Sequence, residues 1–211
     1  MKKIRIIYSS VTGNTREVAA SVFAFLSSVK TKDRNRKSFK NISSRNEYTL
    51  SEYTFLEDIL LGDFLTELHD IRFFHDEISE GDITVLCFWC RRSSLDDLSL
   101  SFLDGIKGRN IMAIGTMSGD AEGEYGSRVR KNVQRAITEK NNCVGVHLCQ
   151  GHSDLKRIEP RCHLDPKSPK YVSPKKWKHH LSIQAHPDEY DIQHAVQFVA
   201  ETLASALASM K

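Results

Sequence analysis

A short polar run near the start of the chain holds the residues best suited to chemistry. Ser9-Ser10-Val11-Thr12-Gly13-Asn14-Thr15 follows β-branched residues 3–8 and precedes residues 18–29, whose apolar side chains recur at helical spacing. A helix start offers free backbone N–H groups and the positive end of the helix dipole, so it can bind a phosphate dianion without lysine or arginine. The predicted phosphate-binding residues are Ser9, Ser10, Thr12, Gly13, Asn14 and Thr15.

Two better-known phosphate loops are excluded, because the run contains neither G-x-G-x-x-G nor G-K-[ST]. The alternative to a binding loop is an ordinary polar turn between a strand and a helix, since Ser, Thr, Asn and Gly favour turns for local reasons. Asn14, with Glu17 three residues later, also predicts a capping box at the start of the helix.

The elements that would position this run alternate between strands and helices. Residues 83–89, 110–116 and 143–149 have strand character. Apolar residues at helical spacing occupy the stretches between them and close the chain, where Asp188 or Asp191 is the expected helix cap. Repeated strand–helix alternation predicts an α/β fold, with a parallel sheet covered by helices on both faces.

Two segments depart from this alternation within a predicted single domain, residues 1–211. Residues 30–80 form an insertion or divergent region, in which the sequence predicts a loop over 30–47 and an amphipathic helix over 53–71. A fifth strand fits near 71–74 or near 48–50, and the sequence does not decide between them. Residues 152–187 hold all five prolines, which predicts an irregular segment with one short helix.

The polar run resembles the [ST]-x-T-G-x-T loop with which flavodoxins hold the phosphate of FMN, with Ser10, Thr12, Gly13 and Thr15 at its key positions. Further short motifs resemble a divergent flavodoxin-like group, some of whose members are accessory proteins of bilirubin reduction in gut bacteria. These motifs are Phe88-Trp89, Gly115-Thr116, Cys149-Gln150-Gly151 and His186-Pro187-Asp188-Glu189-x-Asp191. The resemblance implies a doubly wound, five-stranded parallel sheet of order 2-1-3-4-5 that binds FMN.

In such a sheet, ligands bind beyond the carboxyl ends of the strands, between the first and third strands. The resemblance puts Trp89 where flavodoxins stack an aromatic ring on the flavin, and makes Tyr125 a candidate for the opposite face. Trp89 as a core residue at a strand end and Tyr125 as the first buried residue of a helix are the alternatives. The expected ring-site residues are Phe88, Trp89, Cys90, Arg91, Thr116, Met117, Ser118, Gly119 and Tyr125.

The loop after Trp89 departs from the group, because Cys90-Arg91-Arg92-Ser93-Ser94 contains no glycine. In flavodoxins a glycine here permits a peptide flip that stabilises the half-reduced flavin, and a non-glycine residue resists positive φ. Arg91 or Arg92 near the ring nitrogen N1 would instead favour the anionic reduced ring and raise its potential. The alternative is that both arginines form a solvated pair.

The net charge of +3 conceals three charged blocks. Residues 30–45 hold seven basic residues and one acidic residue, 46–82 hold eleven acidic and one basic, and 156–178 hold eight basic and two acidic. Such blocks are expected to be docking surfaces for a redox partner protein rather than nucleic-acid or membrane sites. Flavodoxins are typically acidic, so the basic blocks indicate an unusual partner. The sequence leaves the oligomeric state open.

Five cysteines without a secretory signal indicate a reducing, cytoplasmic location. Cys87 and Cys90 form a C-x-x-C, but residues three apart in a strand lie about 10 Å apart, too far for a disulfide. The spacing of Cys149, His152, Cys162 and His163 matches no firm zinc signature, so no metal site is expected.

These patterns favour an FMN-binding, flavodoxin-like electron-transfer protein in which no side chain acts as a catalytic group. The first alternative is an FMN-dependent reductase that takes hydride from NAD(P)H, with a substrate pocket built by residues 30–80 and 152–187. The second is a non-catalytic binding protein that keeps the fold and has lost the flavin.

Overall fold

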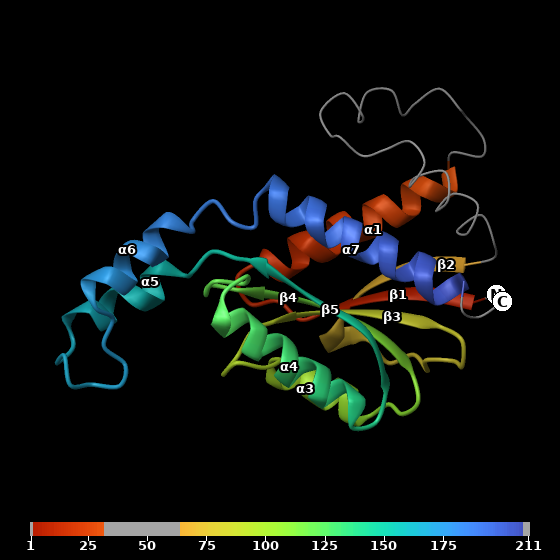
Figure 1. Ribbon diagram of the computed structural model, residues 1–211, viewed down its shortest axis with the longest axis horizontal. Coiled ribbons are helices and arrows are strands. Elements are labelled where there is room, and N and C mark those ends of the chain that lie inside the picture. The colour runs from red at the N-terminus through yellow and green to blue at the C-terminus, as the bar shows by residue number, and fades with distance from the viewer. Residues whose placement is uncertain (1, 32–63, 209–211) are drawn as a thin grey trace.

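A five-stranded, all-parallel sheet of order β2-β1-β3-β4-β5 forms the centre of the computed structural model, which describes residues 2–31 and 64–208 (Figure 1). The strand order and the parallel pairing expected from the sequence are therefore confirmed. The strands are β1 (Lys2–Tyr8), β2 (Phe64–Asp70), β3 (Ile83–Trp89), β4 (Asn110–Met117) and β5 (Asn142–Gln150).

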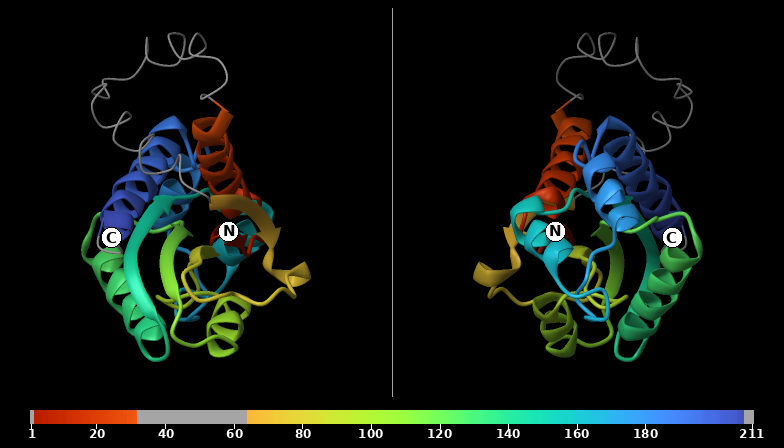
Figure 2. Two further views of the ribbon diagram at one scale, coloured as in Figure 1. Left: turned by 90° about the vertical axis from the view of Figure 1, so that its right-hand side faces the viewer. Right: turned by 90° about the vertical axis from the view of Figure 1, so that its left-hand side faces the viewer.

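Helices cover both faces of the sheet (Figures 1 and 2). One face carries α1 (Asn14–Thr31) and α7 (Glu189–Ala208), and the other carries α3 (Asp97–Asp104) and α4 (Glu124–Thr138). Asp188 caps α7, because its carboxylate accepts from the Asp191 N–H at 3.0 Å while the Asp191 carboxylate accepts from the Asp188 N–H at 3.0 Å. No helix in the described ranges is long and apolar enough to span a membrane.

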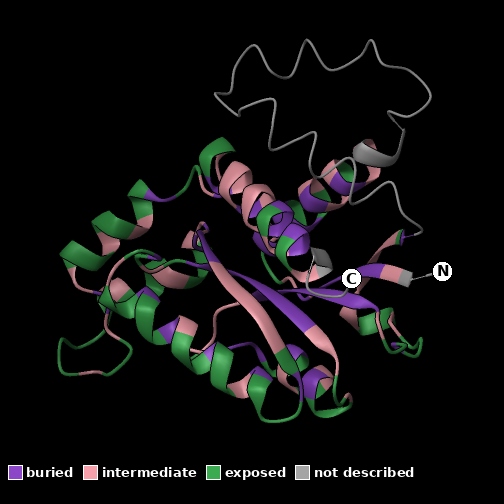
Figure 3. Ribbon diagram, turned by 45° about the vertical axis from the view of Figure 1, so that its right-hand side comes forward, coloured by how far each residue is buried: buried purple, intermediate pink, exposed green. Residues whose placement is uncertain are grey.

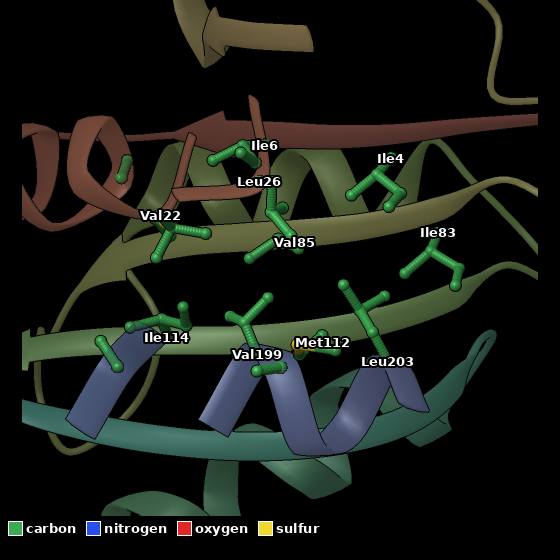
Figure 4. Packing of buried hydrophobic residues seen from close by; sticks show 14 of the residues in the cluster. Ile4, Ile6, Val22, Leu26, Ile83, Val85, Met112, Ile114, Val199 and Leu203 are labelled. Atoms are coloured by element: carbon green, nitrogen blue, oxygen red, sulfur yellow. The ribbon is translucent and has the colours of Figure 1, made fainter. Parts of the chain in front are cut away.

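Alternation along the strands creates two hydrophobic clusters, one on each face. Ile4 and Ile6 pack toward α1 and α7, whereas Ile7 packs toward α3 and α4. Figure 4 shows Val22 and Leu26 of α1 lying over the strands with Ile6 and Val85. Because each fully buried aliphatic side chain contributes about 1.5–3 kcal/mol, these two layers supply most of the stabilisation. Figure 3 shows the buried residues gathered in the strands and inner helix faces.

The second strand is where the sequence prediction fails. The helix predicted over residues 53–71 is wrong for 64–70, which form β2, while residues 32–63 lie outside the described part of the chain. Phe64 and Leu68 both face the core, and a spacing of four residues fits a helix face and a strand face equally well. Residues 71–73 form the 3-10 helix η3 rather than a strand. The alternative strand at 48–50 lies outside the described residues. Most of the loop predicted over 30–47 also lies outside them.

A buried ion network ties the amino-terminal ends of the three adjacent strands. Arg5 is 3% exposed and pairs with Asp82, which also accepts the N–H groups of Lys3 at 2.8 Å and Ser79 at 3.1 Å. Burial alone would raise the pKa of Asp82, but those backbone N–H groups and the Arg5 guanidinium outweigh it, so the pKa is lowered. The network lies at the strand ends opposite the loops that carry the candidate site.

Residues between β5 and α7 form a projection beyond the carboxyl ends of the strands (Figure 1). The predicted irregular segment contains three short helical elements, α5 (Leu155–Ile158), η4 (Glu159–His163) and α6 (Pro174–Ser182), rather than one. Its base is closed by the N–H of His152, which donates to the His186 carbonyl at 2.9 Å. The Gln150 N–H donates to the Asp191 carboxylate at 3.0 Å, which ties the end of β5 to α7 at the base of the projection.

Candidate functional site

Loops at the carboxyl ends of β1, β3, β4 and β5 converge on a cavity of about 580 Å³, and the projection closes its outer side. Parallel strands present their carboxyl ends at one edge of the sheet, so loops far apart in sequence meet there. The cavity is lined by Val11, Thr12, Asn14, Trp89, Cys90, Arg91, Arg92, Thr116, Met117, Ser118, His152, Ser153, Asp154, Arg157, Ile158 and Arg161.

The run between β1 and α1 has the geometry of an anion-binding turn. Gly13 has φ +101°, a conformation that glycine adopts without strain, and no atom lies within 4 Å of the position a side chain would take. Its N–H donates to the Ser10 hydroxyl at 3.2 Å, which folds the loop back toward the start of α1. Thr12 is exposed at the cavity, so its hydroxyl is available to a ligand.

Two of the expected phosphate-binding hydroxyls are engaged with the protein. The Ser9 hydroxyl donates to Asp96 at 2.8 Å, and that same carboxylate caps α3. The hydroxyl oxygens of Thr15 and Thr116 lie 2.8 Å apart, and both residues are buried. Ser9 and Thr15 therefore hold the loop against α3 and β4, whereas Thr12 and Asn14 face the cavity.

Asn14 does not form the capping box predicted with Glu17. Its side-chain amide instead donates to the His152 carbonyl at 2.9 Å, across 138 positions of sequence. Gly151 permits this approach, because a Cβ at that position would lie 2.7 Å from the Asn14 Nδ2 atom. The Asn14 Oδ1 atom is buried without a protein partner, which leaves one acceptor that a ligand hydroxyl can satisfy.

Trp89 lies at the boundary between two hollows. Its side chain lines the 580 Å³ cavity and a smaller one of about 210 Å³, which is also lined by Ser9, Ser10 and Asp96. Phe88, also expected at the site, is fully buried on the opposite face among α3 and α4, where its ring fills the space over Gly115. Adjacent strand residues point to opposite faces, so the Phe88 side chain lies on the side of the sheet away from that of Trp89, and its expected contact with a cofactor stays a prediction.

The loop after Trp89 reaches positive φ without glycine. Arg91 and Ser94 exchange backbone hydrogen bonds of 2.9 and 3.0 Å around Arg92 at φ 51° and Ser93 at φ 63°. Two consecutive left-handed residues define the turn that suits a tight β-hairpin and usually carries Asn-Gly. The absence of glycine therefore does not prevent this backbone conformation, although it costs about 1 kcal/mol at each residue.

The two arginines of this turn differ in their pairing. Arg91 forms an ion pair with Asp97 at the start of α3, so most of its charge is compensated. Arg92 also lines the cavity and makes no ion pair with any residue in the described part of the chain. The uncompensated positive charge at this end of the cavity comes from Arg92.

A second cavity, of about 930 Å³, adjoins the first and shares Cys90, Met117 and Ser118 with it. Tyr125 forms part of its wall, and Gly119 packs against the Tyr125 ring. Helix α6 provides the outer side, fixed by His179, whose Nε2 donates to the Ser118 carbonyl at 2.7 Å. Ser173, Lys175, Lys176 and His180 complete the lining from the projection.

The cysteines are reduced, and two of them are too deeply buried to react. Burial raises the pKa of the Cys87 thiol to about 12 and raises that of Cys149 further still. Cys90, which lines both large cavities, also has a raised pKa because it is largely buried. These thiols are therefore protonated at neutral pH and suited to packing.

His186, Asp188 and Asp191 form the one group of three metal-ligand side chains found among the described residues. The His186 Nδ1 donates to Asp191 at 2.5 Å, and the two aspartates cap α7. These contacts explain why the three side chains lie together: they hold the start of α7 at the base of the projection.

The sequence reasoning did not assign site residues to the projection. His152, Ser153, Arg157 and Arg161 line the first cavity, and Lys175, Lys176 and His179 line the second. The basic block at 156–178 and the reductase alternative both pointed to this segment, but nothing in the sequence indicated which of its residues face the cavities.

The residues present fit FMN. The cavity volume lies within the range of about 300–1,000 Å³ that is usual for small-molecule sites. Thr12, Gly13 and Asn14 would hold the phosphate at the start of α1, and Trp89 offers a partly exposed aromatic face near Met117.

Comparison with known proteins agrees with this geometry. Residues 57–200 match the family described as flavodoxin domain, a range that does not include the loop before α1. The flavodoxin-like domain-containing protein BilS of Clostridioides difficile (strain CD3) is 23% identical over 207 residues, which cover 97% of this chain and 98% of that protein.

Two solved structures share the fold. Oxidised Flavodoxin 1 from Bacillus cereus superposes with a TM-score of 0.51 at 14% identity, covering 97% of this chain and 98% of that one. A short-chain flavodoxin associated with a non-canonical PDU bacterial microcompartment gives a TM-score of 0.50 at 16% identity, covering 98% and 99%. With its sheet order, its ligand-sized cavity and a family match over more than half its length, the chain belongs to the flavodoxin domain family.

Proposed function

We propose that this protein binds FMN non-covalently in the 580 Å³ cavity and transfers electrons. The observation that carries the proposal is the convergence of the Gly13 turn, Trp89 and the Thr116–Ser118 segment on one cavity at the strand ends. Bound FMN would supply the redox chemistry by accepting and releasing electrons. Flavodoxin-family membership supports the same choice of cofactor.

The protein side chains would bind and shield rather than react. Thr12 and the backbone N–H groups at the start of α1 would neutralise the phosphate through hydrogen bonds and the helix dipole. Arg92 would place positive charge beside the cavity and favour a ligand that gains negative charge on reduction. Trp89 and Met117 would exclude water from one part of the ring.

Titration with FMN and with riboflavin tests the proposal, because riboflavin has the same ring and no phosphate. Quenching of flavin fluorescence should show FMN binding at least about tenfold tighter than riboflavin. Thr12→Ala should reduce this ratio. Ser21→Ala, which removes an exposed hydroxyl bonded to its own helix at 3.0 Å, should leave the ratio unchanged.

The outcomes separate the parts of the proposal. Equal affinity for FMN and riboflavin would remove the phosphate-binding role of the loop. A purified protein without flavin colour and without affinity for either ligand would leave only a non-catalytic binding protein. Reduction by dithionite, followed by reoxidation with a one-electron acceptor, then measures electron transfer directly.

A second candidate function, reduction of a small substrate with NAD(P)H, is favoured by the 930 Å³ cavity beside the first one. The projection builds the outer wall of this cavity, as a substrate pocket would require. Oxidation of NAD(P)H by the pure FMN-loaded protein, followed at 340 nm by its usual absorbance, distinguishes the two. A carrier oxidises NAD(P)H only when a separate reductase is added.

A further inference from the structure

The projection between β5 and α7 carries an unusual concentration of unpaired positive charge. All eight basic residues of the block at 156–178 are exposed, and none makes an ion pair with another described residue. They are Lys156, Arg157, Arg161, Lys167, Lys170, Lys175, Lys176 and Lys178.

The acidic residues nearby do not cancel this charge. Residues 152–178 hold three acidic residues, Asp154, Glu159 and Asp165, so the eight basic residues leave this stretch with a net charge of +5. Asp97 is paired with Arg91, and Glu122 is paired with Arg130 at 2.8 Å. The positive field of the projection is therefore free to act on another molecule.

The basic groups lie at the openings of both cavities. Arg157 and Arg161 line the 580 Å³ cavity, and Lys175 and Lys176 line the 930 Å³ cavity. A partner held by these side chains would therefore sit against the side of the molecule from which electrons would enter or leave.

We infer that the face formed by residues 155–182 docks an acidic protein that exchanges electrons with this one. The inference rests on the proposed FMN function and adds the partner's chemistry to it. Complementary charge speeds encounter and orients the two proteins, with a contribution that salt screens. A protein is favoured over a nucleic acid because the two large aromatic side chains of this face, Tyr171 and Trp177, are only partly exposed and offer little ring surface for base stacking.

The test uses rubredoxin as an acidic one-electron probe and cytochrome c as a basic one. In each reaction the dithionite-reduced, FMN-loaded protein passes one electron to a ferric iron, which becomes ferrous. Two irons are reduced for each two-electron-reduced protein, and the proton released from the ring passes to solvent. Stopped-flow rates should fall about tenfold for rubredoxin between about 0.02 and 0.2 M salt, and should rise for cytochrome c.

A pair of charge-reversed variants locates the effect. Lys156→Glu with Lys178→Glu changes the projection at exposed positions that line neither cavity. Lys131→Glu with Arg135→Glu makes the same change in net charge on exposed positions of α4. The first variant should lose most of the salt dependence with rubredoxin, and the second should keep it.

A binding measurement independent of electron transfer completes the test. Zinc-substituted rubredoxin, which cannot be reduced, should shift the amide resonances of residues 155–182 in the ¹⁵N-labelled protein. Shifts confined elsewhere, or a salt response equal in both variants, would overturn the docking face. Tighter binding of duplex DNA or phosphatidylglycerol vesicles to the same residues would overturn the choice of an acidic protein.

Failure of the proposed FMN function gives a different result. FMN affinity is measured by fluorescence in the wild type and in both variants, and it should be equal in all three. If the wild type binds zinc rubredoxin at residues 155–182 but does not bind FMN, the docking face stands and the proposed cofactor is overturned. If the wild type binds FMN but its electron transfer does not depend on salt, the proposed cofactor stands and the docking face is overturned.

Discussion

The hydroxyl oxygens of Thr15 and Thr116 lie 2.8 Å apart, in the first turn of α1 and near the end of β4. Both residues are almost fully buried, at 1% and 3% exposure, so neither hydroxyl has water as an alternative partner. The bond joins the start of α1 to the end of β4, where Thr116 lines the candidate cavity. It therefore holds α1 against β4 next to the site.

Removing one hydroxyl should lower the free energy of unfolding by more than half of the loss seen when both are removed. Thr15→Val and Thr116→Val should each lower the free energy of unfolding by about 1–2 kcal/mol, because the remaining hydroxyl is buried without a partner. The double variant should lose less than the sum of the two. Urea denaturation measures all three, with Thr138→Val on the exposed face of α4 as the control. Strictly additive losses would show that the two hydroxyls do not interact.

The contact between Asn14 and Gly151 should be intolerant of a single methyl group. In Gly151→Ala the new Cβ would lie 2.7 Å from the Asn14 amide nitrogen, so the bond from Asn14 to His152 must break or lengthen. FMN affinity should fall about tenfold, equivalent to about 1.4 kcal/mol.

Gly105→Ala provides the control, because its nearest atom would be an ordinary contact at 3.5 Å and its φ is −79°. Flavin fluorescence quenching compares the two variants. An unaltered affinity in Gly151→Ala would mean that the two loops can separate without affecting the site.

Glycine in the turn after Trp89 should stabilise the protein. Ser93 has φ 63°, a conformation that costs an L-residue about 1 kcal/mol or more and that glycine adopts freely. Ser93→Gly should therefore raise the free energy of unfolding by about 0.5–1 kcal/mol. Ser94→Gly, at a neighbouring position without positive φ, should lower it. If both substitutions destabilise equally, the turn is not in this conformation in solution.

The titration of His147 should lower the free energy of unfolding as the pH falls from about 6.5 to about 4. Burial, with a smaller contribution from Arg130, lowers the pKa of His147 from 6.5 to about 4. Below pH 6.5 the unfolded chain binds a proton that the folded protein rejects until about pH 4, so stability is lost as the pH falls. The loss is at most about 3 kcal/mol.

His147→Phe should remove the His147 part of this dependence, because phenylalanine can keep the stacked contact with Phe198, whose ring centroid lies 5.3 Å away. Burial also lowers the pKa of His180, so a part of the dependence should remain in the variant. Thermal unfolding at pH 7.5 and pH 5 compares the variant with the wild type. The lowered pKa of Asp82 acts at more acidic pH, below its ordinary 3.8, so it does not contribute in this window. An equal loss of stability in both proteins would assign the effect to other groups.

Local pattern was sufficient for the interior strands and the helices that cover them. β3 is apolar except at Thr84 because both of its faces are covered, and α4 repeats Val129, Val133 and Ile137 on one side. The polar run before α1 indicated a binding loop, and the structure places Thr12 and Asn14 at the cavity. These features depend on residues close together in sequence, which is why they could be predicted.

Long-range contacts decided the rest. β2 is an edge strand whose apolar spacing also fits a helix, and only its pairing with β1 resolves that ambiguity. The Asn14 side chain could cap its own helix or bond to His152. It bonds to His152 because Gly151 lets the two loops touch. The sequence determined four of the five strands, the helices that cover them and the loop that can hold a phosphate. Only the tertiary structure brought a basic segment 140 positions later over that loop, because charge and proline content do not encode where a segment packs.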